Sequence, residues 1–332
     1  MIKELLKNIK KNKLIKAGDT VIIGTSGGRD SMALLFALHS LRDELGVKVV
    51  SAHFNHSLRG EASDGDEKFV SDFCKGLGID FVSTAMPIAE LAKGKNLEEV
   101  ARIYRYGWLN EIADRYGDSK TAKIAVAHHA QDQAETVLLH LLRGSGTQGL
   151  KAMSFKSGRI IRPLLNIDRA VLEDYLIEHN IAYRDDATNF SNQYTRNSIR
   201  LDLMPELMKY NPAIVKALVT TADICGAEDD YLNECIEKIK EELIIDSEDG
   251  YAINRKELLK KPLALQRRLV RYLWQKVSKE EGGGLGYQHT DAVLALVKGK
   301  KLPLPQQVYA KSDGKNLYIL RRDSDYLSTP KR

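Results

Sequence analysis

The chain contains 332 residues, of which 43% are hydrophobic and 29% charged, and it carries a formal net charge of +5. This composition is typical of a globular protein with a packed core and excludes a disordered chain, while the small positive charge permits a nucleic-acid partner without requiring one. Three widely spaced cysteines form no CxxC pair, which excludes a zinc ribbon and a redox dithiol, and no apolar run is long enough to cross a membrane. We therefore expect a protein of the reducing cytoplasm with no membrane partner.

Helical and extended patterns alternate along the first 212 residues. An amphipathic helix is predicted at the N-terminus, where Ile2, Leu5 and Ile9 share one face. It is followed by predicted strands at residues 20–24, 47–54, 79–83 and 123–127, and by predicted helices at residues 30–45, 67–77, 96–112, 132–142 and 168–178. Strands separated by helices predict an α/β fold with a Rossmann-like parallel sheet. Because ligands bind beyond the carboxyl ends of such strands, we expect the chemistry just after Ile23, Val50 and Val126.

The pattern changes after residue 212. Residues 214–243 are predicted to be mostly helical, and residues 258–277 form a second helical stretch that is rich in arginine. Two extended segments flank Asp313-Gly314 near the C-terminus and predict a closing β-hairpin. We therefore predict two domains: residues 1–212 form the α/β domain, and residues 213–332 form a smaller, mainly helical domain with a terminal hairpin.

The segment Ser26-Gly27-Gly28-Arg29-Asp30-Ser31 lies between the first predicted strand and the helix that follows it. Adjacent glycines allow positive φ and a close approach of the backbone, so that N–H groups and a helix N-terminus converge on one point that suits an anion. The two serines add hydroxyl donors. Asp30 is unusual beside a phosphate group, but it makes sense if a magnesium ion bridges the two. The loop has neither the lysine of a Walker A motif nor the GxGxxG spacing.

Two further clusters follow strand ends. His53 and His56 are three residues apart, but no carboxylate or cysteine completes a metal site, so a structural or nucleotide-contacting role is favoured over zinc. His129 ends the strand at residues 123–127 together with His128, and Asp132 and Glu135 then share one face of the next helix. These carboxylates could simply complement the helix N-terminus, or they could hold an ammonium group or a magnesium ion. Their position beside two histidines favours a site.

The segment at residues 184–200 mixes arginines with amides and aromatic rings. Arginine suits phosphate contacts, whereas amides and rings suit bases. A solvated turn followed by an ordinary helix start explains the pattern equally well. The residues concerned are Arg184, Asn189, Phe190, Asn192, Tyr194, Arg196, Asn197 and Arg200.

The six-residue loop resembles the SGGxDS pyrophosphate loop of the N-type ATP pyrophosphatases. Members of that superfamily cleave ATP between the α and β phosphates and form an adenylated intermediate. Within it, the chain is similar to the tRNA(Ile)-lysidine synthetases. The matching stretches are GTSGGRDSMALL, HFNHSLRG, LEEVARIYRYGWL, AHHAQDQAETVLLHLLRGSG, IIRPLL and YRDDATNFSNQYTRNSIR, in the family order. Ser57 stands where glycine is usual in the family, and Gln131 stands where an acidic residue is common. The chain resembles the shorter form of the family.

The resemblance implies an N-type ATP pyrophosphatase domain and a specific reaction. ATP adenylates the C2 oxygen of the wobble cytidine of tRNA(Ile) with a CAU anticodon, and L-lysine then displaces AMP to give lysidine. In this sequence, Ser26, Gly27, Gly28, Arg29, Asp30 and Ser31 are expected to bind ATP, with Asp30 holding magnesium. Asp132 and Glu135 are expected to bind lysine and, with Asp30, to be catalytic, whereas Arg184, Arg196, Asn197 and Arg200 are expected to bind tRNA. The oligomeric state stays open, a homodimer being one option.

Three alternatives compete with this interpretation. A tRNA thiolation enzyme uses the same kind of loop, but it usually needs paired cysteines, which this sequence does not have. An amidating ligase of the same superfamily would consume ATP without tRNA. A catalytically silent RNA-binding protein is disfavoured because the loop and both carboxylates are intact. The interpretation requires the phosphate loop and the acidic helix to open into a common cavity.

Overall fold

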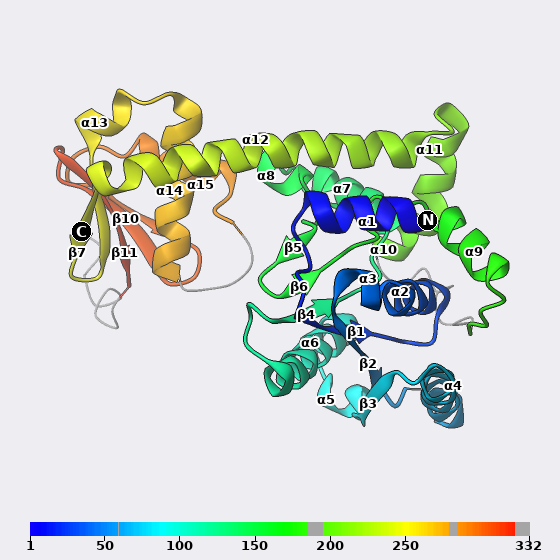
Figure 1. Cartoon of the computed structure of the whole chain (residues 1–332). Coiled ribbons are helices and arrows are strands. Elements are labelled where there is room, and N and C mark those ends of the chain that lie inside the picture. The colour runs from blue at the N-terminus through cyan, green and yellow to red at the C-terminus, as the bar shows by residue number, and fades with distance from the viewer. Residues whose placement is uncertain (59, 185–194, 279–283, 323–332) are drawn as a thin grey trace. The chain divides into compact units, whose positions relative to one another are not determined.

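A computed structural model describes residues 1–58, 60–184, 195–278 and 284–322 of the chain (Figure 1). The chain divides into two compact units, Met1–Gly226 and Ala227–Arg332. Helix α12 (Ile214–Leu243) contains the boundary between the units, whereas the boundary predicted from the sequence, at residue 212, lies before this helix. In the described part of the chain, every helix is too short or too polar to cross a membrane.

The first unit is built on a six-stranded, mostly parallel sheet in the order β3-β2-β1-β4-β6-β5, in which only β5 is antiparallel to its neighbour. Its strands are β1 (Thr20–Gly24), β2 (Lys48–Asn55), β3 (Asp80–Ala85), β4 (Ala122–Ala125), β5 (Lys156–Ser157) and β6 (Ile160–Ile161). Its helices are α1 (Ile2–Lys11), α2 (Arg29–Ser40), α3 (Arg42–Leu45), α4 (Glu61–Leu77), α5 (Ile88–Leu91), α6 (Leu97–Tyr116), α7 (Ala130–Leu142), α8 (Thr147–Leu150), α9 (Arg169–Glu178), α10 (Thr195–Ser198), the π-helical turn η2 (Ile199–Leu203) and α11 (Met204–Tyr210). The predicted fold class is confirmed.

Successive side chains of β1 point to opposite faces of this sheet and pack into two separate cores. Val21 and Ile23 pack into a core with helices α1, α2, α4 and α9, whereas Ile22 packs on the opposite face with α5 and α6. This follows from the two-residue period of a strand. Both faces are therefore covered by helices, and the carboxyl ends of β1, β2 and β4 lie along one edge of the sheet.

A third core positions the helices that carry the candidate site. Ala134 and Leu138 of α7 pack against Ile199 of η2, Met204 of α11 and Val215 of α12. This packing holds η2 against α7, beside the face of α7 that carries Asp132 and Glu135. The basic residues at 196 and 200 are thereby held beside the acidic helix.

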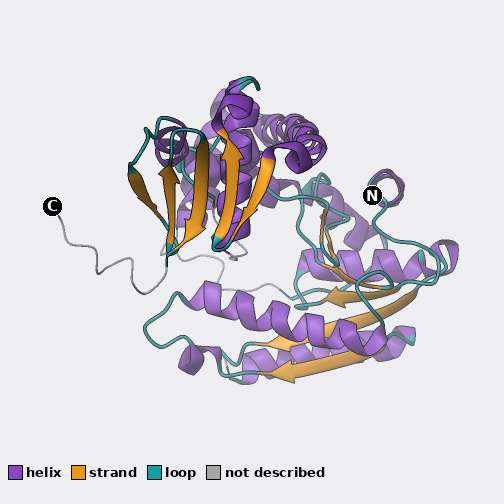
Figure 2. Ribbon diagram, turned by 90° about the vertical axis from the view of Figure 1, so that its left-hand side faces the viewer, coloured by secondary structure: helices purple, strands orange, loops and turns teal. Residues whose placement is uncertain are grey.

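The second unit combines helices with a five-stranded antiparallel sheet in the order β7-β8-β11-β10-β9 (Figure 2). Its elements after α12 are β7 (Ile244–Ser247), β8 (Gly250–Asn254), α13 (Arg255–Leu259), α14 (Leu263–Ser278), α15 (Tyr287–Leu294), β9 (Lys301–Leu304), β10 (Val308–Ser312) and β11 (Asn316–Arg321). The predicted hairpin is β10–β11, and the structure adds three strands to it. A core that includes Leu269, Leu273 and Trp274 of α14 joins the helices to this sheet.

Two predicted helices are each divided in the structure. The helix predicted at residues 30–45 ends at Ser40, and α3 follows it directly. The helix predicted at residues 258–277 is split into α13 and α14 by Pro262, which has no backbone N–H and cannot continue α13. The predicted N-caps Asn96 and Asp168 are confirmed, because their side chains accept hydrogen bonds from the backbone N–H groups of Glu99 and Ala170.

Candidate active site

The phosphate loop is a turn that its own hydroxyl groups hold in shape. Gly27 has φ of +88°, a conformation that favours glycine, whereas Gly28 has φ of −75° and precedes α2, so only one of the two glycines uses positive φ. The Ser31 hydroxyl accepts from the Ser26 backbone N–H at 3.2 Å and donates to the Gly28 carbonyl at 2.9 Å. The loop is therefore shaped before any ligand binds.

A cavity of about 460 Å³ opens beside this loop at the carboxyl ends of the strands. It is lined by Ser26, Gly28, Arg29, Asp30 and Ser31 of the loop, by His53, Asn55 and His56 at the end of β2, by Arg105 and Tyr106 of α6, and by His128, Arg169 and Arg184. Residues that follow β1, β2 and β4 therefore line one pocket. We call it the nucleotide pocket.

The histidine at the end of β2 has a structural contact. His53 is buried and donates from Nδ1 to the carbonyl of Thr25 at 2.9 Å, which ties β2 to the end of β1. Burial lowers the pKa of His53, so its ring is neutral at pH 7. The ring of His56 packs against that of Phe54, with 4.8 Å between centroids.

His128 is a neutral donor at the wall of the nucleotide pocket. Its Nδ1 lies 3.3 Å from Nε of Arg162. A guanidinium can only donate, so Nδ1 is an acceptor and the ring proton lies on Nε2. Burial is the main cause that lowers the pKa of His128 to about 3; the Asp132 carboxylate opposes this shift, and the nearby Arg162 and Arg196 add to it. His128 therefore offers an N–H group, not a base, at neutral pH.

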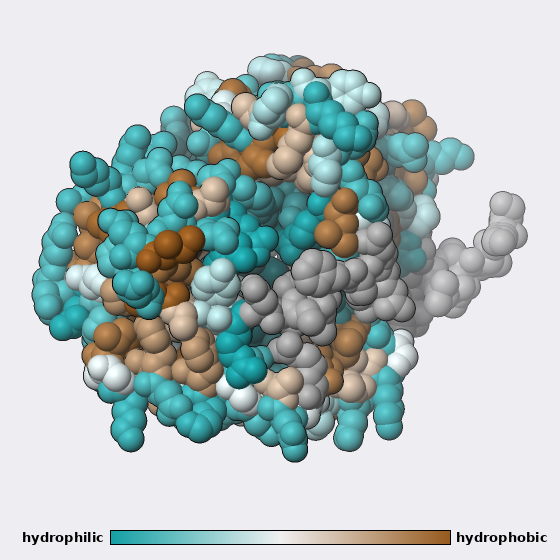
Figure 3. Space-filling model, turned by 90° about the vertical axis from the view of Figure 1, so that its right-hand side faces the viewer, coloured by the Kyte–Doolittle hydropathy of each residue, from teal (hydrophilic) through white to brown (hydrophobic). Residues whose placement is uncertain are grey.

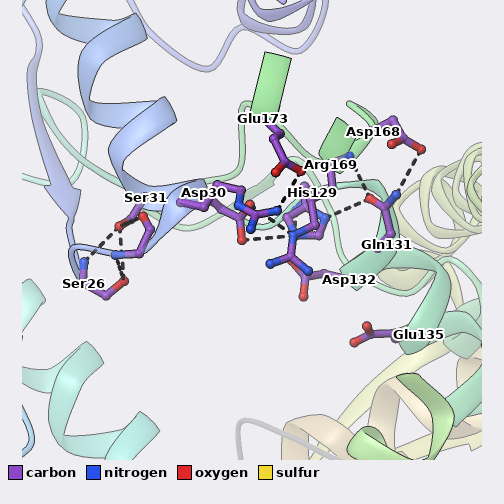
Figure 4. Close-up of polar contacts among 12 residues, drawn as sticks. Ser26, Asp30, Ser31, His129, Gln131, Asp132, Glu135, Asp168, Arg169 and Glu173 are labelled. Atoms are coloured by element: carbon purple, nitrogen blue, oxygen red, sulfur yellow. Dashed lines mark hydrogen bonds and ion pairs between the residues drawn. The ribbon is translucent and has the colours of Figure 1, made fainter. Parts of the chain in front are cut away.

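His129 joins the phosphate loop to the acidic helix α7 (Figure 4). Its Nε2 lies 3.4 Å from a carboxylate oxygen of Asp30 and 3.5 Å from one of Asp132. Burial alone would lower the pKa of His129, but these two carboxylates raise it above its ordinary value. The amide oxygen of Gln131 lies 3.1 Å from Nδ1 and also accepts from the backbone N–H of Arg169 at 3.0 Å.

A second, smaller cavity of about 210 Å³ adjoins the first and contains the acidic residues. It is lined by Asp30, His129, Gln131, Asp132, Glu135, Arg169, Arg200, Met204, Pro205 and Met208. We call it the acidic pocket. Ser26 and Asp132 therefore line two adjoining pockets, not one common cavity. Both pockets include Asp30 and Arg169, so the two are in direct contact at these residues.

Both carboxylates of α7 are bound by arginines. Nε of Arg200 lies 2.6 Å from Oε1 of Glu135, and Nε of Arg196 lies 3.0 Å from Oε2. Guanidinium nitrogens of the same two arginines lie 3.1 and 3.4 Å from Oδ1 of Asp132. Burial would raise the pKa of Asp132, but His129, His128 and Arg196 hold it below its ordinary value. Two carboxylates thus face two guanidinium groups, and Glu135 is only 3% exposed.

The structure separates the arginines that the sequence groups together. Arg200 lines the acidic pocket, Arg196 pairs with the same two carboxylates, and Asn197 lies between them on α10. Arg184 lines the nucleotide pocket instead, where its side chain pairs with Asp66 at 2.8 Å and its backbone N–H donates to the Gly27 carbonyl. Asn189, Phe190, Asn192 and Tyr194 lie outside the described residues.

Sequence reasoning missed Arg105, Tyr106 and Arg169, which line the nucleotide pocket. Arg105 and Tyr106 of α6 belong to the stretch LEEVARIYRYGWL, to which no role was assigned, although paired arginines around a tyrosine on a helix could have indicated an anion contact. Burial lowers the pKa of Arg105, a cost that a bound anion would offset. Arg169 follows the predicted cap Asp168 and carried no signal in the sequence.

The donor set suits magnesium bound together with phosphate. Oδ1 of Asp30 is buried and has no hydrogen-bond partner among the described residues, and the nearest cation to it, Nε of Arg169, is 3.8 Å away. Magnesium is usually held by one or two carboxylates together with phosphate oxygens and water. The part of the chain that the structure describes contains no cluster of three or more His, Cys, Asp or Glu side chains that could bind a metal alone. Asp30 therefore suits a magnesium ion that it would hold together with the phosphates of a nucleotide.

Comparison with known proteins identifies the class of this site. The PP-loop domain family matches residues 1–207, which contain the phosphate loop and both pockets. A U34-tRNA thiolase, NcsA from Methanococcus maripaludis with its [4Fe-4S] cluster, has a similar structure, with a TM-score of 0.53 and 19% identity over 67% of this chain and 77% of that one. That likeness shows the fold alone. The first unit is a PP-loop domain.

Relatives at higher identity define the particular family. The tRNA(Ile)-lysidine synthase of Clostridium acetobutylicum is 36% identical over 93% of this chain and 68% of its own length. The tRNA(Ile)-lysidine synthase of Caldanaerobacter subterraneus subsp. tengcongensis is 36% identical over 97% of this chain and 69% of its own length. The chain belongs to the tRNA(Ile)-lysidine synthase family. It is therefore a ligase-type enzyme, and its PP-loop domain implies the use of ATP.

Proposed function

We propose that the protein ligates L-lysine to C2 of the wobble cytidine of tRNA(Ile) with a CAU anticodon, giving lysidine, AMP and pyrophosphate. The observation that carries the proposal is the meeting of two pockets at Asp30 and Arg169, one lined by the Ser-Gly-Gly loop and one lined by the carboxylates of Asp132 and Glu135. Family membership supports the choice of tRNA and lysine.

The first step is the adenylation of the base. The phosphate loop would hold the β and γ phosphates of ATP through backbone N–H groups and the hydroxyl groups of Ser26 and Ser31. Asp30 would hold a magnesium ion, which when bound lowers the charge of the phosphates. Arg29 shapes the loop, because it pairs with Glu173 at 2.8 Å and lies over the ring of Tyr183. The Nε2–H of His128 would donate to the substrate.

The second step is the attack of the lysine amine, which needs a site for a cation. Asp132 and Glu135 supply two buried negative charges, but Arg196 and Arg200 already bind both. An ammonium group must therefore share these carboxylates with a guanidinium or displace it. Phosphates of the tRNA would accept a displaced guanidinium, which connects the predicted lysine-binding and tRNA-binding residues. As expected from the sequence, Arg184 and Asn197 would also bind the tRNA, and we propose that the second unit contacts it as well.

Replacing Asp132 by asparagine tests this assignment. The amide would keep the size of the side chain but remove one charge that binds the amine, so we expect kcat/KM for lysine to fall by about 10- to 100-fold, as for the loss of a charged hydrogen-bond partner. Formation of labelled lysidine from lysine, ATP and tRNA(Ile) transcript measures the effect. The matched control is D43N, which removes an exposed carboxylate on α3. Full lysine transfer by D132N would exclude Asp132 from the site.

Thiolation of tRNA is the alternative within the same fold. Cys74 and Cys225 are buried, Cys235 is partly exposed, and none of the three forms a disulfide. Burial raises the pKa of the Cys74 thiol, which opposes formation of the nucleophilic thiolate. We expect a variant with all three cysteines replaced by serine or alanine to retain lysidine formation. Loss of activity in a variant that keeps its fold, with sulfur transfer by the wild type, would favour thiolation.

A further inference from the structure

Arg169 occupies the place where the two pockets meet. It is the first residue of α9, and it lines both the nucleotide pocket and the acidic pocket. Figure 4 shows it between Asp30 of the phosphate loop and the residues at the start of α7. Its side chain is 44% exposed, so a ligand in either pocket can reach the guanidinium.

The backbone of Arg169 is fixed. Its N–H donates to the amide oxygen of Gln131 at 3.0 Å, and the amide nitrogen of Gln131 donates to Asp168 at 3.0 Å. Asp168 in turn caps α9. Because the start of α9 is tied to the start of α7 in this way, the guanidinium extends from a rigid base, and little backbone order is lost when it binds a ligand.

The side chain of Arg169, in contrast, is held loosely. Two other arginines of the nucleotide pocket, Arg29 and Arg184, form ion pairs of 2.8 Å with Glu173 and Asp66. Within the described part of the chain, the ion pair of Arg169 is with Asp30 at 3.8 Å, beyond hydrogen-bond range. Arg169 can therefore change partner at lower cost than Arg29 or Arg184.

We propose that Arg169 is a catalytic residue that binds the β and γ phosphates of ATP and stabilises pyrophosphate as it leaves. This inference rests on the proposed function. In the adenylation step, the C2 oxygen of the cytidine bonds to the α phosphorus, and the bond from that phosphorus to the oxygen bridging to the β phosphorus breaks. The electron pair of the broken bond leaves with pyrophosphate, so negative charge grows beside the phosphate loop. A guanidinium at this point stabilises the growing charge.

The position next to Asp30 explains why the arginine acts on this part of the nucleotide. Asp30 follows the glycines that would hold the terminal phosphates, and Arg169 is the neighbouring cation. Without nucleotide, Arg169 balances the charge of Asp30. With nucleotide, it moves to the phosphates. After pyrophosphate leaves, Arg169 returns to Asp30, at the border of the pocket where the amine arrives.

Binding measurements with the R169A variant test this inference without tRNA or lysine. We expect the affinity for ATP and for inorganic pyrophosphate, measured by calorimetry with magnesium, to fall about tenfold, since one charge-assisted contact is lost. The affinity for AMP, which has no β or γ phosphate, should change by less than about twofold on the same grounds. R169K keeps the charge without the planar fork and should recover part of the affinity.

Kinetics then separate the two half-reactions. Adenylation of the tRNA can be measured in a single turnover without lysine, with released pyrophosphate as the readout. We expect R169A to slow this step by about 100-fold. Transfer of lysine to previously adenylated tRNA should keep its rate. R115A, which removes an exposed arginine near the end of α6, is the matched control.

Two results would overturn the inference. One is pyrophosphate binding by R169A equal to that of the wild type, and the other is an equal loss of AMP affinity, which would indicate a distorted pocket. The proposed function fails separately, if the wild type binds ATP and pyrophosphate but forms no lysidine.

Discussion

The side chain of Asp132 both caps a helix and takes part in the charged cluster, so the two roles considered for it from the sequence are compatible. One carboxylate oxygen accepts from the backbone N–H of His129 at 3.1 Å, which is the capping role expected near a helix N-terminus. The other oxygen binds Arg196 and Arg200. The sequence could not reveal the second role, because these arginines lie more than 60 residues away and reach α7 only through the packing of η2.

Two departures from the family pattern are also explained at single residues. Ser57 has φ of +51°, a left-handed conformation in which glycine is unstrained, so glycine is the expected residue there. Gln131 donates from its amide to Asp168 and accepts from Arg169 with its oxygen. An acidic residue at this position could not donate to Asp168. Neither effect could be predicted from one sequence, because both depend on backbone conformation and on distant partners.

The low pKa of His128 leads to a prediction for stability against pH. The folded protein keeps this ring neutral down to about pH 3, whereas the unfolded chain protonates it near pH 6.5. Between these values the unfolded state binds more protons, so the contribution of His128 to stability is complete above pH 6.5 and is lost as the pH falls. We expect H128Q to lose less unfolding free energy than the wild type between pH 7 and pH 5, by on the order of 1 kcal/mol.

Urea unfolding at the two pH values measures this difference. H289Q, which removes an exposed histidine on α15, serves as the control and should behave as the wild type does. Equal pH dependence in H128Q and the wild type would show that folding does not lower the pKa of His128.

At the scale of elements, helix α6 depends on a cap that the sequence already indicates. The side chain of Asn96 accepts from the Glu99 N–H at 3.2 Å, and the helix beyond it carries Arg105 and Tyr106 to the nucleotide pocket. N96A should lower the unfolding free energy of the first unit by about 1 kcal/mol, whereas N96D should keep most of it. The readout is Trp108 fluorescence in a W274F background, since these are the two tryptophans of the chain. An unchanged urea midpoint in N96A would mean that this bond contributes nothing.

Strands and helices whose apolar residues follow a regular spacing could be predicted from the sequence. Strands that form only by pairing with distant parts of the chain could not. Strands β1, β2 and β4 and the caps of α6 and α9 follow from local patterns. Strands β7, β8 and β9 were missed because they are short and at least partly exposed, and they form only by pairing with the predicted hairpin or with each other. The division between the two pockets was missed for the same reason: the residues they share, Asp30 and Arg169, come from separate helices.

At the scale of the whole molecule, each unit has its own apolar core. Exposed apolar side chains lie among hydrophilic ones on the face shown in Figure 3. The second unit contains a buried ion pair between Asp229 and Arg268, whose side chains are 1% and 5% exposed. Asn233 also accepts from this arginine at 2.8 Å. The pair ties α12 to α14 within the unit.

Breaking this pair tests whether the units are independently stable. D229A leaves a buried guanidinium without its partner charge and should destabilise the second unit by about 3–5 kcal/mol. Trp274 fluorescence in a W108F background should report an earlier unfolding transition, while the dissociation constant for ATP stays that of the wild type. D230A, which changes the exposed neighbouring residue, is the matched control. A parallel loss of ATP binding would show that the two units fold as one.

The four-residue interval between Arg196 and Arg200 restricts how this stretch of the gene can vary. Both arginines reach the same two carboxylates because they are about one helical turn apart. Deleting one codon between them would rotate one guanidinium by about 100° away from its partners, however similar the remaining residues were. Length should therefore be less tolerant of change than composition between these two positions.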